Sequence, residues 1–277
     1  MAAGHDLNMT AKSTIKAIGA DSGGTWTRIT AFDARMRPVR RARFKTGEFR
    51  SLPAKLLREI GRWPGAELAP LVIASRGVFS RKWKKPFLVK ALSGKLNLAA
   101  VISDAEAAHF AAFSGKAGTL LLAGTGAVVF CGKPGAFAKI GGHNPPSGDP
   151  GSGRWLGRQY LKRLGRLREA AAMGHGRTAA YAAKLLARAQ KGHRACALLA
   201  EEAARELAAL LRTAAGPGAR PVKAALAGGL MESGYFRETF VRTAGLVLGK
   251  RRLVFIKAEM TAEEAAARLS LLRRRTT

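Results

Sequence analysis

Residues 15–32 read Ile15-Lys-Ala-Ile-Gly-Ala-Asp21-Ser-Gly-Gly-Thr25-Trp-Thr-Arg-Ile-Thr-Ala-Phe32. Apolar side chains gather on both sides of a turn that contains two successive glycines. We therefore predict two short strands, Ile15–Ala20 and Arg28–Phe32, joined into a hairpin. In the turn, Gly23 and Gly24 are expected to take positive φ angles and to bring bare backbone N–H groups together.

This hairpin turn has two interpretations. Backbone N–H groups beside a hydroxyl, here that of Thr25, can hold phosphate oxygens, and a carboxylate at a strand end, here Asp21, can hold Mg²⁺ through water. The other interpretation is a turn without any ligand, because Gly-Gly turns are common. The turn by itself does not decide between the two.

Strands and helices alternate along the rest of the chain. The expected strands are Val39–Phe44, Leu71–Ala74, Ala99–Ile102, Gly118–Ala123, Ala127–Cys131, Ala136–Ile140, Val222–Ala227 and Leu253–Ile256. The expected helices are Leu52–Trp63, Phe87–Leu92, Asp104–Phe113, a helix that begins near Arg154, Ala179–Ala189, Arg194–Ala214, Tyr235–Leu248 and Ala262–Arg273. This alternation predicts an α/β fold. The glycine-turn hairpin of residues 15–32 has a counterpart in residues 118–140, which suggests an architectural repeat.

The composition fits a folded protein with a strongly basic surface. The chain has 277 residues, of which 47% are hydrophobic, and a formal net charge of +30. A chain of this length can bury a real core and lies near the size at which one core divides into two, so it is not a disordered basic tail. The charge attracts nucleic acid or phosphorylated ligands. Because it is spread along the chain, we interpret it as a generally cationic surface with nonspecific nucleic-acid binding.

The cysteines and the apolar segments indicate the cellular compartment in which the protein is expected. Cys131 and Cys196 belong to no Cys-x-x-Cys pair or Cys/His cluster, so neither a disulfide framework nor a zinc site is predicted. The first fifteen residues lack the apolar segment of a secretory signal. Thr119–Cys131, the longest apolar stretch, is too short to span a bilayer. We expect a soluble cytoplasmic protein in a reducing compartment, without a membrane partner.

Asp104 follows the predicted strand Ala99–Ile102. A carboxylate in this position stands at the carboxyl edge of a sheet, where α/β proteins place their ligands. The alternative is that Asp104 caps the next helix, since Asp is a preferred capping residue. The two roles can coexist.

Three further loops carry glycines next to strand ends. Gly124-Thr125-Gly126 is a second phosphate-type turn, Gly148-Asp149-Pro-Gly-Ser-Gly153 runs into a helix, and Gly228-Gly229 follows a strand. Two glycine turns with a carboxylate between them could surround a triphosphate. His143 is the histidine that lies among these loops. The sequence contains no P-loop, no Gly-x-Ser-x-Gly elbow and no Gly-x-Gly-x-x-Gly that opens a βαβ unit.

Taken in order, these motifs resemble a known family. The ordered set is Asp21-Ser-Gly-Gly-Thr-Trp-Thr, Ser103-Asp104-Ala105, Ala123-Gly-Thr-Gly126, Gly141-Gly-His, Gly148-Asp-Pro-Gly-Ser-Gly-Arg-Trp-Leu-Gly157 and Ala227-Gly-Gly-Leu230. It resembles the N-acetylglucosamine kinase and BadF/BadG-type ATPase family of the actin and sugar kinase superfamily. The likeness extends over most of the chain, and residues 103–157 carry it most strongly.

The resemblance implies an α/β fold of two ribonuclease H-like (actin-like ATPase) lobes that close over ATP. The implied organisation is a flexible arm at 1–13, an N-terminal lobe at 14–103, a C-terminal lobe at 104–260 and a helix at 261–277 that returns to the first lobe. The chain would then be an ATP-dependent sugar kinase that phosphorylates a sugar hydroxyl. The substrate that the family implies is an amino sugar such as N-acetylglucosamine or glucosamine. A homodimer fits the family.

The resemblance also implies roles for individual residues. Asp104 would be the general base and Asp21 the carboxylate that positions Mg²⁺. The residues that would bind the nucleotide are Ser22, Gly23, Gly24, Thr25, Gly124, Thr125, Gly126, Gly228 and Gly229. Asp149, Gly142 and His143 would bind the sugar.

The sequence also departs from the family pattern and leaves two alternatives open. The loop Thr46-Gly-Glu-Phe-Arg50 lacks the Asn-bearing pattern with which the family's kinases grip the sugar. One alternative is a BadF-type ATPase that activates a dehydratase, although such activators need cysteines for an iron–sulfur cluster between subunits. The other is a basic nucleic-acid-binding protein on the same fold, whose binding would weaken steeply with salt.

Overall fold

The computed structural model describes residues 14–24, 26–133, 136–217, 221–249 and 253–273. The arm predicted at 1–13 therefore lies outside the described residues. The chain divides into two compact units. Unit 1 comprises Met1–Ala107 and Met260–Thr277, and unit 2 comprises Ala108–Glu259.

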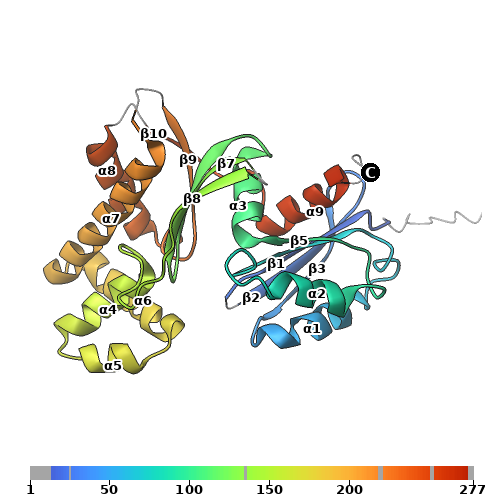
Figure 1. The fold of residues 1–277 in the computed structure, drawn as a ribbon, viewed down its shortest axis with the longest axis horizontal. Coiled ribbons are helices and arrows are strands. Elements are labelled where there is room, and N and C mark those ends of the chain that lie inside the picture. Colours follow the sequence, from blue (N-terminus) through green and yellow to red (C-terminus); the bar gives the residue numbers. More distant parts are fainter. Residues whose placement is uncertain (1–13, 25, 134–135, 218–220, 250–252, 274–277) are drawn as a thin grey trace, which may run out of the picture. The chain divides into compact units, whose positions relative to one another are not determined.

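Unit 1 contains a five-stranded sheet with helices on both faces (Figure 1). Its strands are β1 (Ala17–Ser22), β2 (Trp26–Phe32), β3 (Pro38–Lys45), β4 (Leu71–Ser75) and β5 (Leu98–Ser103), in the order β3-β2-β1-β4-β5. β1, β2 and β3 are antiparallel neighbours, whereas β4 runs parallel to β1 and β5 parallel to β4.

The sequence of β1 explains the layering of unit 1. Successive side chains of a strand point to opposite faces. Ile18 and Ala20 face the core formed with α1 (Leu52–Ile60) and α2 (Lys84–Leu92). Ala17 faces the other way and packs against Ala267 of α9 (Ala262–Arg273). All five residues of β4 are buried, as expected for a strand covered on both faces.

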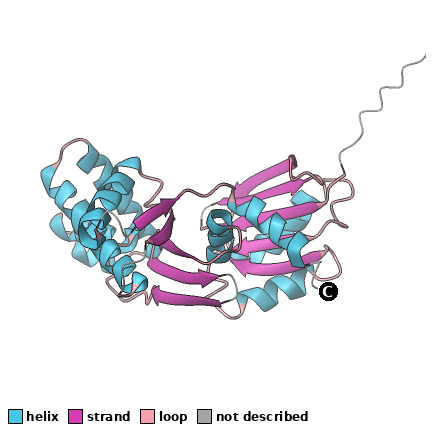
Figure 2. Ribbon diagram, turned by 90° about the horizontal axis from the view of Figure 1, so that it is seen from above, coloured by secondary structure: helices cyan, strands magenta, loops and turns pink. Residues whose placement is uncertain are grey.

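Unit 2 repeats this architecture. Its strands are β6 (Gly118–Ala123), β7 (Ala127–Lys133), β8 (Ala136–Gly141), β9 (Val222–Ala227) and β10 (Leu253–Ile256), in the order β10-β9-β6-β7-β8. Again three antiparallel strands are followed by two that run parallel to the first of them. The strands of both sheets are drawn in magenta in Figure 2. The repeat suggested by the two glycine-turn hairpins is thereby confirmed.

The helices of unit 2 form most of its core. They are α4 (Gly153–Arg163), α5 (Leu167–Ala172), α6 (His175–Gln190), α7 (Arg194–Ala215) and α8 (Gly234–Leu248). α7 buries an apolar stripe that includes Leu199, Leu207 and Leu211, and α8 adds Phe236 and Phe240. α3 (Asp104–Phe113) carries the chain from β5 to β6. Within the residues that the structure describes, no helix is long and apolar enough to cross a membrane.

Most predicted elements are present, and the differences lie mainly at their ends. The prediction missed a 3₁₀ turn at Phe49–Ser51 and the short helix α5. It also ended the first strand at Ala20, whereas β1 continues through Asp21 and Ser22, which pair with residues of both β2 and β4. Asp21 is therefore held by the sheet rather than by a loose turn.

Candidate active site

One group of predicted residues lies at the carboxyl edge of the unit 1 sheet. β1, β4 and β5 run side by side, and their last residues, Ser22, Ser75 and Ser103, lie in register. The residues that follow these serines meet at the edge where α/β proteins place ligands. Gly23 and Asp104 are the next residues after two of these strands.

The β1–β2 turn differs from the prediction. Neither Gly23 nor Gly24 takes a positive φ angle. The N–H of Gly23 donates to the carbonyl of Trp26 at 3.0 Å, which closes the hairpin. A Cβ at Gly24 would meet the guanidinium of Arg76, which would have to move aside. This glycine therefore provides space rather than backbone freedom. Thr25, which we predicted as part of the phosphate turn, lies outside the described residues.

A buried chain of hydroxyl groups supports this turn. The hydroxyl of Thr27 lies 3.2 Å from that of Ser22 and 3.0 Å from that of Thr46. All three residues are buried. The carbonyl of Ser22 accepts the N–H of Arg76 at 3.0 Å. Ser22 is thus fixed by its side chain and its backbone, and its hydroxyl is directed into the protein.

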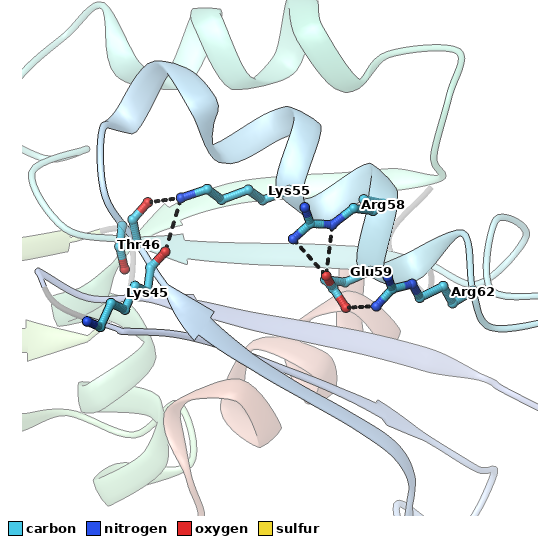
Figure 3. Close-up of polar contacts among 6 residues, drawn as sticks. All are labelled: Lys45, Thr46, Lys55, Arg58, Glu59 and Arg62. Carbon is cyan, nitrogen blue, oxygen red and sulfur yellow. Dashed lines mark hydrogen bonds and ion pairs between the residues drawn. The ribbon is translucent and has the colours of Figure 1, made fainter.

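The loop that follows β3 is fixed by a lysine of α1. The ammonium of Lys55 donates to the carbonyls of Lys45 and Thr46, at 3.1 and 3.0 Å (Figure 3). One turn further along α1, Glu59 pairs with two exposed arginines, Arg58 and Arg62 (Figure 3). Lys55 thereby anchors the start of the segment 46–50.

Asp21 lies in β1 opposite Arg28, whose guanidinium approaches the carboxylate at 3.7 Å. Burial raises the pKa of Asp21 to about 6, helped by the negative charges of Glu263 and Asp104 and opposed by Arg28. The side chain is 16% exposed. The fold therefore holds a carboxylate in a place where its charge is unfavourable, which is typical of functional sites.

We predict that Asp21→Asn stabilises the protein most at high pH. Because the folded pKa of Asp21 lies above the unfolded value, the wild-type protein loses stability as the pH rises from about 4 through about 6, and the variant does not. The gain in unfolding free energy should be about 2 kcal/mol larger at pH 8 than at pH 4. Urea denaturation of both proteins at the two pH values measures it. An equal effect at both pH values would contradict the shifted pKa.

The surroundings of Asp21 fit a bound Mg²⁺. The cation would relieve the repulsion that Asp21 experiences from Glu263 and Asp104. Among the described residues no three His, Cys, Asp or Glu side chains surround a common point. Mg²⁺ commonly binds through one or two carboxylates and completes its shell with water and substrate phosphates. Asp21 would therefore hold the ion together with a phosphate ligand.

Asp104 is not needed to cap α3. The N–H and hydroxyl of Ser103 donate to the carboxylate of Glu106 at 2.8 and 3.0 Å, and the hydroxyl of Ser103 accepts the N–H of Glu106 at 3.1 Å. This reciprocal arrangement is a capping box. The carboxylate of Asp104 accepts the N–H of its neighbour Ala105 at 3.1 Å and a hydrogen bond from its own backbone. The alternative interpretation of Asp104 as a helix cap thus loses its support.

The electrostatic environment of Asp104 suits a proton acceptor. Burial raises the pKa of this carboxyl above its usual value. The N–H of Ala105 and the positive charges of Arg76 and Lys84 oppose this rise. A buried carboxylate whose pKa is raised is a suitable general base.

A second group of predicted residues lies together in unit 2. The carbonyls of Gly124 and Thr125 accept the N–H groups of Gly153 and Arg154, at 2.7 and 3.1 Å, where α4 begins. The β6–β7 turn therefore lies against the start of α4. On its other side, the turn Gly228–Gly229 is held there because Leu230, which follows it, donates its N–H to the carbonyl of Ala123 at 3.0 Å.

Asp149 organises these loops. One of its carboxylate oxygens accepts the N–H of Ala127 at 3.1 Å, and the other accepts the N–H of Asn144 at 2.6 Å. A side chain at Gly126 would lie 2.7 Å from the first oxygen, so only glycine fits there. Asp149 is buried, whereas His143 is exposed. Gly142 and His143 directly precede Asn144, so Asp149 fixes the backbone next to both of them.

The structure thus brings the predicted residues into two groups, one in each unit. Ser22–Gly24, Asp21 and Asp104 lie at the sheet edge of unit 1, and the glycine turns and Asp149 lie at the corresponding end of β6 and β9 in unit 2. Sequence reasoning missed Arg76 and Lys84, the cations near Asp104. No motif marks them, although the spacing Ser-x-x-Glu at 103–106 could have identified the capping box.

The two cysteines both lie within regular secondary structure, Cys131 in a strand and Cys196 in a helix. Cys196 is buried in α7 within the core of unit 2. Cys131 in β7 is partly buried, and its thiol contacts the hydroxyl of Thr119 and the carbonyl of Ala214. Burial raises the pKa of the Cys131 thiol. A buried Cys196 is unsuited to a cluster shared between subunits, as the dehydratase-activator alternative would require.

Known proteins match this chain in structure. No protein-family model matches the sequence, and no curated protein is similar to it. A proposed N-acetylglucosamine kinase from Chromobacterium violaceum is 22% identical with a TM-score of 0.69, over 93% of this chain and 99% of that one. A ROK family glucokinase from Streptomyces griseus, solved with glucose and AMPPNP, is 18% identical with a TM-score of 0.64, over 92% and 99%. This chain has the fold of sugar kinases.

A third match agrees with this fold. A proposed N-acetylmannosamine kinase from Listeria monocytogenes is 14% identical with a TM-score of 0.68, over 94% of this chain and all of that one (100%). The predicted α/β class with ribonuclease H-like lobes is thereby confirmed. At these identities the matches establish the fold, and the function has to be argued from the site.

Proposed function

We propose that this protein is an ATP-dependent sugar kinase, which transfers the γ-phosphoryl group of ATP to a hydroxyl of a sugar. The observation that carries the proposal is the state of Asp104. Its carboxylate is released from helix capping by Ser103 and Glu106, and burial raises its pKa. It stands at the same sheet edge as the glycine turn of β1–β2.

In this reaction Asp104 acts as the general base. It accepts the proton of the acceptor hydroxyl while the hydroxyl oxygen forms a bond to the γ-phosphorus. The bond between that phosphorus and the oxygen bridging to the β-phosphate breaks, and ADP leaves. Phosphoryl transfer mainly requires in-line placement and charge neutralisation, so one carboxylate and a set of N–H groups and cations suffice.

The nucleotide residues follow from the same proposal. The turns Ser22–Thr25 and Gly124–Gly126 bind phosphate oxygens, and Gly228–Gly229 lies against the adenosine. Asp21 would hold Mg²⁺, which when bound would supply positive charge to the phosphates. Support comes from the buried, unfavourable charge of Asp21 and from the glucokinase match, which was solved with an ATP analogue.

For the acceptor we propose an amino sugar. The support is that two of the three matches reported above are proposed kinases of N-acetylated amino sugars. Gly142 and His143 line the sugar, and Asp149 acts chiefly by fixing the loop that carries them, because each of its oxygens already accepts a backbone N–H. The oxygens retain lone pairs with which Asp149 can also accept a sugar hydroxyl.

A product assay tests the proposed function. The protein is incubated with Mg-ATP and glucosamine, N-acetylglucosamine, N-acetylmannosamine or glucose, and sugar phosphate and ADP are both quantified. We expect Mg²⁺-dependent formation of the two products in equal amounts with at least one amino sugar. ADP without sugar phosphate would favour an ATPase. Salt-sensitive binding to random DNA without either product would favour the nucleic-acid-binding alternative.

A further inference from the structure

Arg76 occupies an unusual position at the sheet edge of unit 1. β4 ends at Ser75, in register with Ser22 and Ser103, so Arg76 directly follows the same row as Gly23 and Asp104. Its N–H donates to the carbonyl of Ser22 at 3.0 Å. The backbone of Arg76 is therefore hydrogen-bonded to the residue at which the glycine turn begins.

The side chain of Arg76 lies across this turn. Its guanidinium occupies the space that a Cβ at Gly24 would take. Its charge also acts on Asp104. A group bound to the turn and facing Asp104 would consequently meet the guanidinium. Arg76 is exposed, and no carboxylate of the described residues forms an ion pair with it.

Lys84 holds the backbone of the segment that follows β4. Its side chain is buried, and its ammonium donates to the carbonyl of Arg76 at 2.7 Å. The same ammonium lies 4.1 Å from the centre of the Phe49 ring. A buried lysine normally requires a partner, and here the partner is the backbone of Arg76. Lys84 therefore restricts the residue that carries the exposed guanidinium.

We propose that Arg76 binds the terminal phosphate of the nucleotide and that Lys84 is a positioning residue for it. The proposal rests on the proposed kinase function. A guanidinium offers several N–H donors in a fixed plane, which suits phosphate oxygens. Placed between the glycine turn and Asp104, it contacts the phosphate that is transferred rather than the two that remain in ADP.

A comparison of two nucleotides tests this role. Binding of Mg-AMPPNP, which has the terminal phosphate, and of Mg-ADP, which lacks it, is measured by isothermal titration calorimetry. We expect Arg76→Ala to weaken AMPPNP binding about tenfold and ADP binding less than about twofold. Lys84→Met should act in the same direction and more weakly. Lys82→Ala, an exposed cation of the same segment, is the matched control and should change neither affinity.

The outcomes separate this inference from the proposed function. If the wild-type protein binds neither nucleotide, both are wrong. If it binds both and Arg76→Ala weakens them equally, or weakens neither, the role of Arg76 is wrong and the kinase proposal stands. The ratio of the two affinities is insensitive to general destabilisation. Melting temperatures show whether the Lys84→Met protein folds. If it does not, the Arg76→Ala variant alone tests the proposal, because Arg76 is exposed.

Discussion

Asp104→Asn abolishes sugar-dependent release of ADP, with a loss of at least about 10³-fold in kcat, while nucleotide affinity changes less than about twofold. Asparagine has the size of aspartate but cannot accept the proton of the acceptor hydroxyl. The melting temperature should stay the same or rise. The helix is capped by Ser103 and Glu106, and the variant removes a charge whose burial is unfavourable. Steady-state kinetics, calorimetry and thermal denaturation measure the three effects.

A matched substitution controls for the chemical change. Asp33 is a buried aspartate of the same unit, and its carboxylate accepts the N–H groups of Arg35 and Arg37, both at 2.9 Å. Asp33→Asn should lower stability because those bonds are weakened, and leave kcat unchanged. Retention of full turnover by Asp104→Asn would remove the general base from the proposal. A loss of turnover that merely parallels a lower melting temperature would also count against a chemical role.

The sequence predicts most of the fold because its strands are marked by local signals. Apolar residues on both sides of a glycine turn predicted the hairpin in residues 15–32, and the counterpart in residues 118–140 indicated the repeat. Strand ends were less predictable: Asp21 and Ser22 are polar, and only pairing with β2 and β4 makes them part of β1. The short helix α5 lacked a clear apolar stripe and buries only Ala170.

A site residue could be predicted where a carboxylate closely follows the end of a predicted strand, as Asp104 does. It was not predictable where the function of a residue depends on register. The role proposed for Arg76 depends on the pairing of Ser75 with Ser22 and Ser103 across three strands, and such pairing between distant segments has no local signature. Similarly, Asp149 appeared as a sugar ligand by resemblance, and its hydrogen bonds to Ala127 and Asn144 could not be read from spacing.

Gly19→Ala should destabilise unit 1 by about 3 kcal/mol or more, because the new methyl group has no space. Gly19 lies in β1 on the face that α9 covers. A Cβ there would coincide with the carbonyl oxygen of Glu263 and lie 2.8 Å from the backbone nitrogen of Ala267. Both are backbone atoms of a helix, so no side chain can rotate away. The helix has to move, and Ala266 and Ala267, which are fully buried, lose their contacts.

This prediction is measurable because the tryptophans are unevenly distributed. Trp26, Trp63 and Trp83 belong to unit 1, whereas Trp155 belongs to unit 2. Tryptophan fluorescence during urea denaturation therefore reports mainly on unit 1. Gly176→Ala provides the control: Gly176 lies in α6 of unit 2 with open space around it, so alanine there should leave the fluorescence transition of unit 1 unchanged.

The same substitution bears on the site, since α9 carries Glu263, whose charge raises the pKa of Asp21. A displaced helix should therefore weaken Mg²⁺-nucleotide binding as well as stability, although Gly19 cannot touch a ligand. If Gly19→Ala unfolds within about 0.5 kcal/mol of the wild-type protein, α9 does not lie on β1 as described, and the environment of Asp21 would have to be reconsidered together with it.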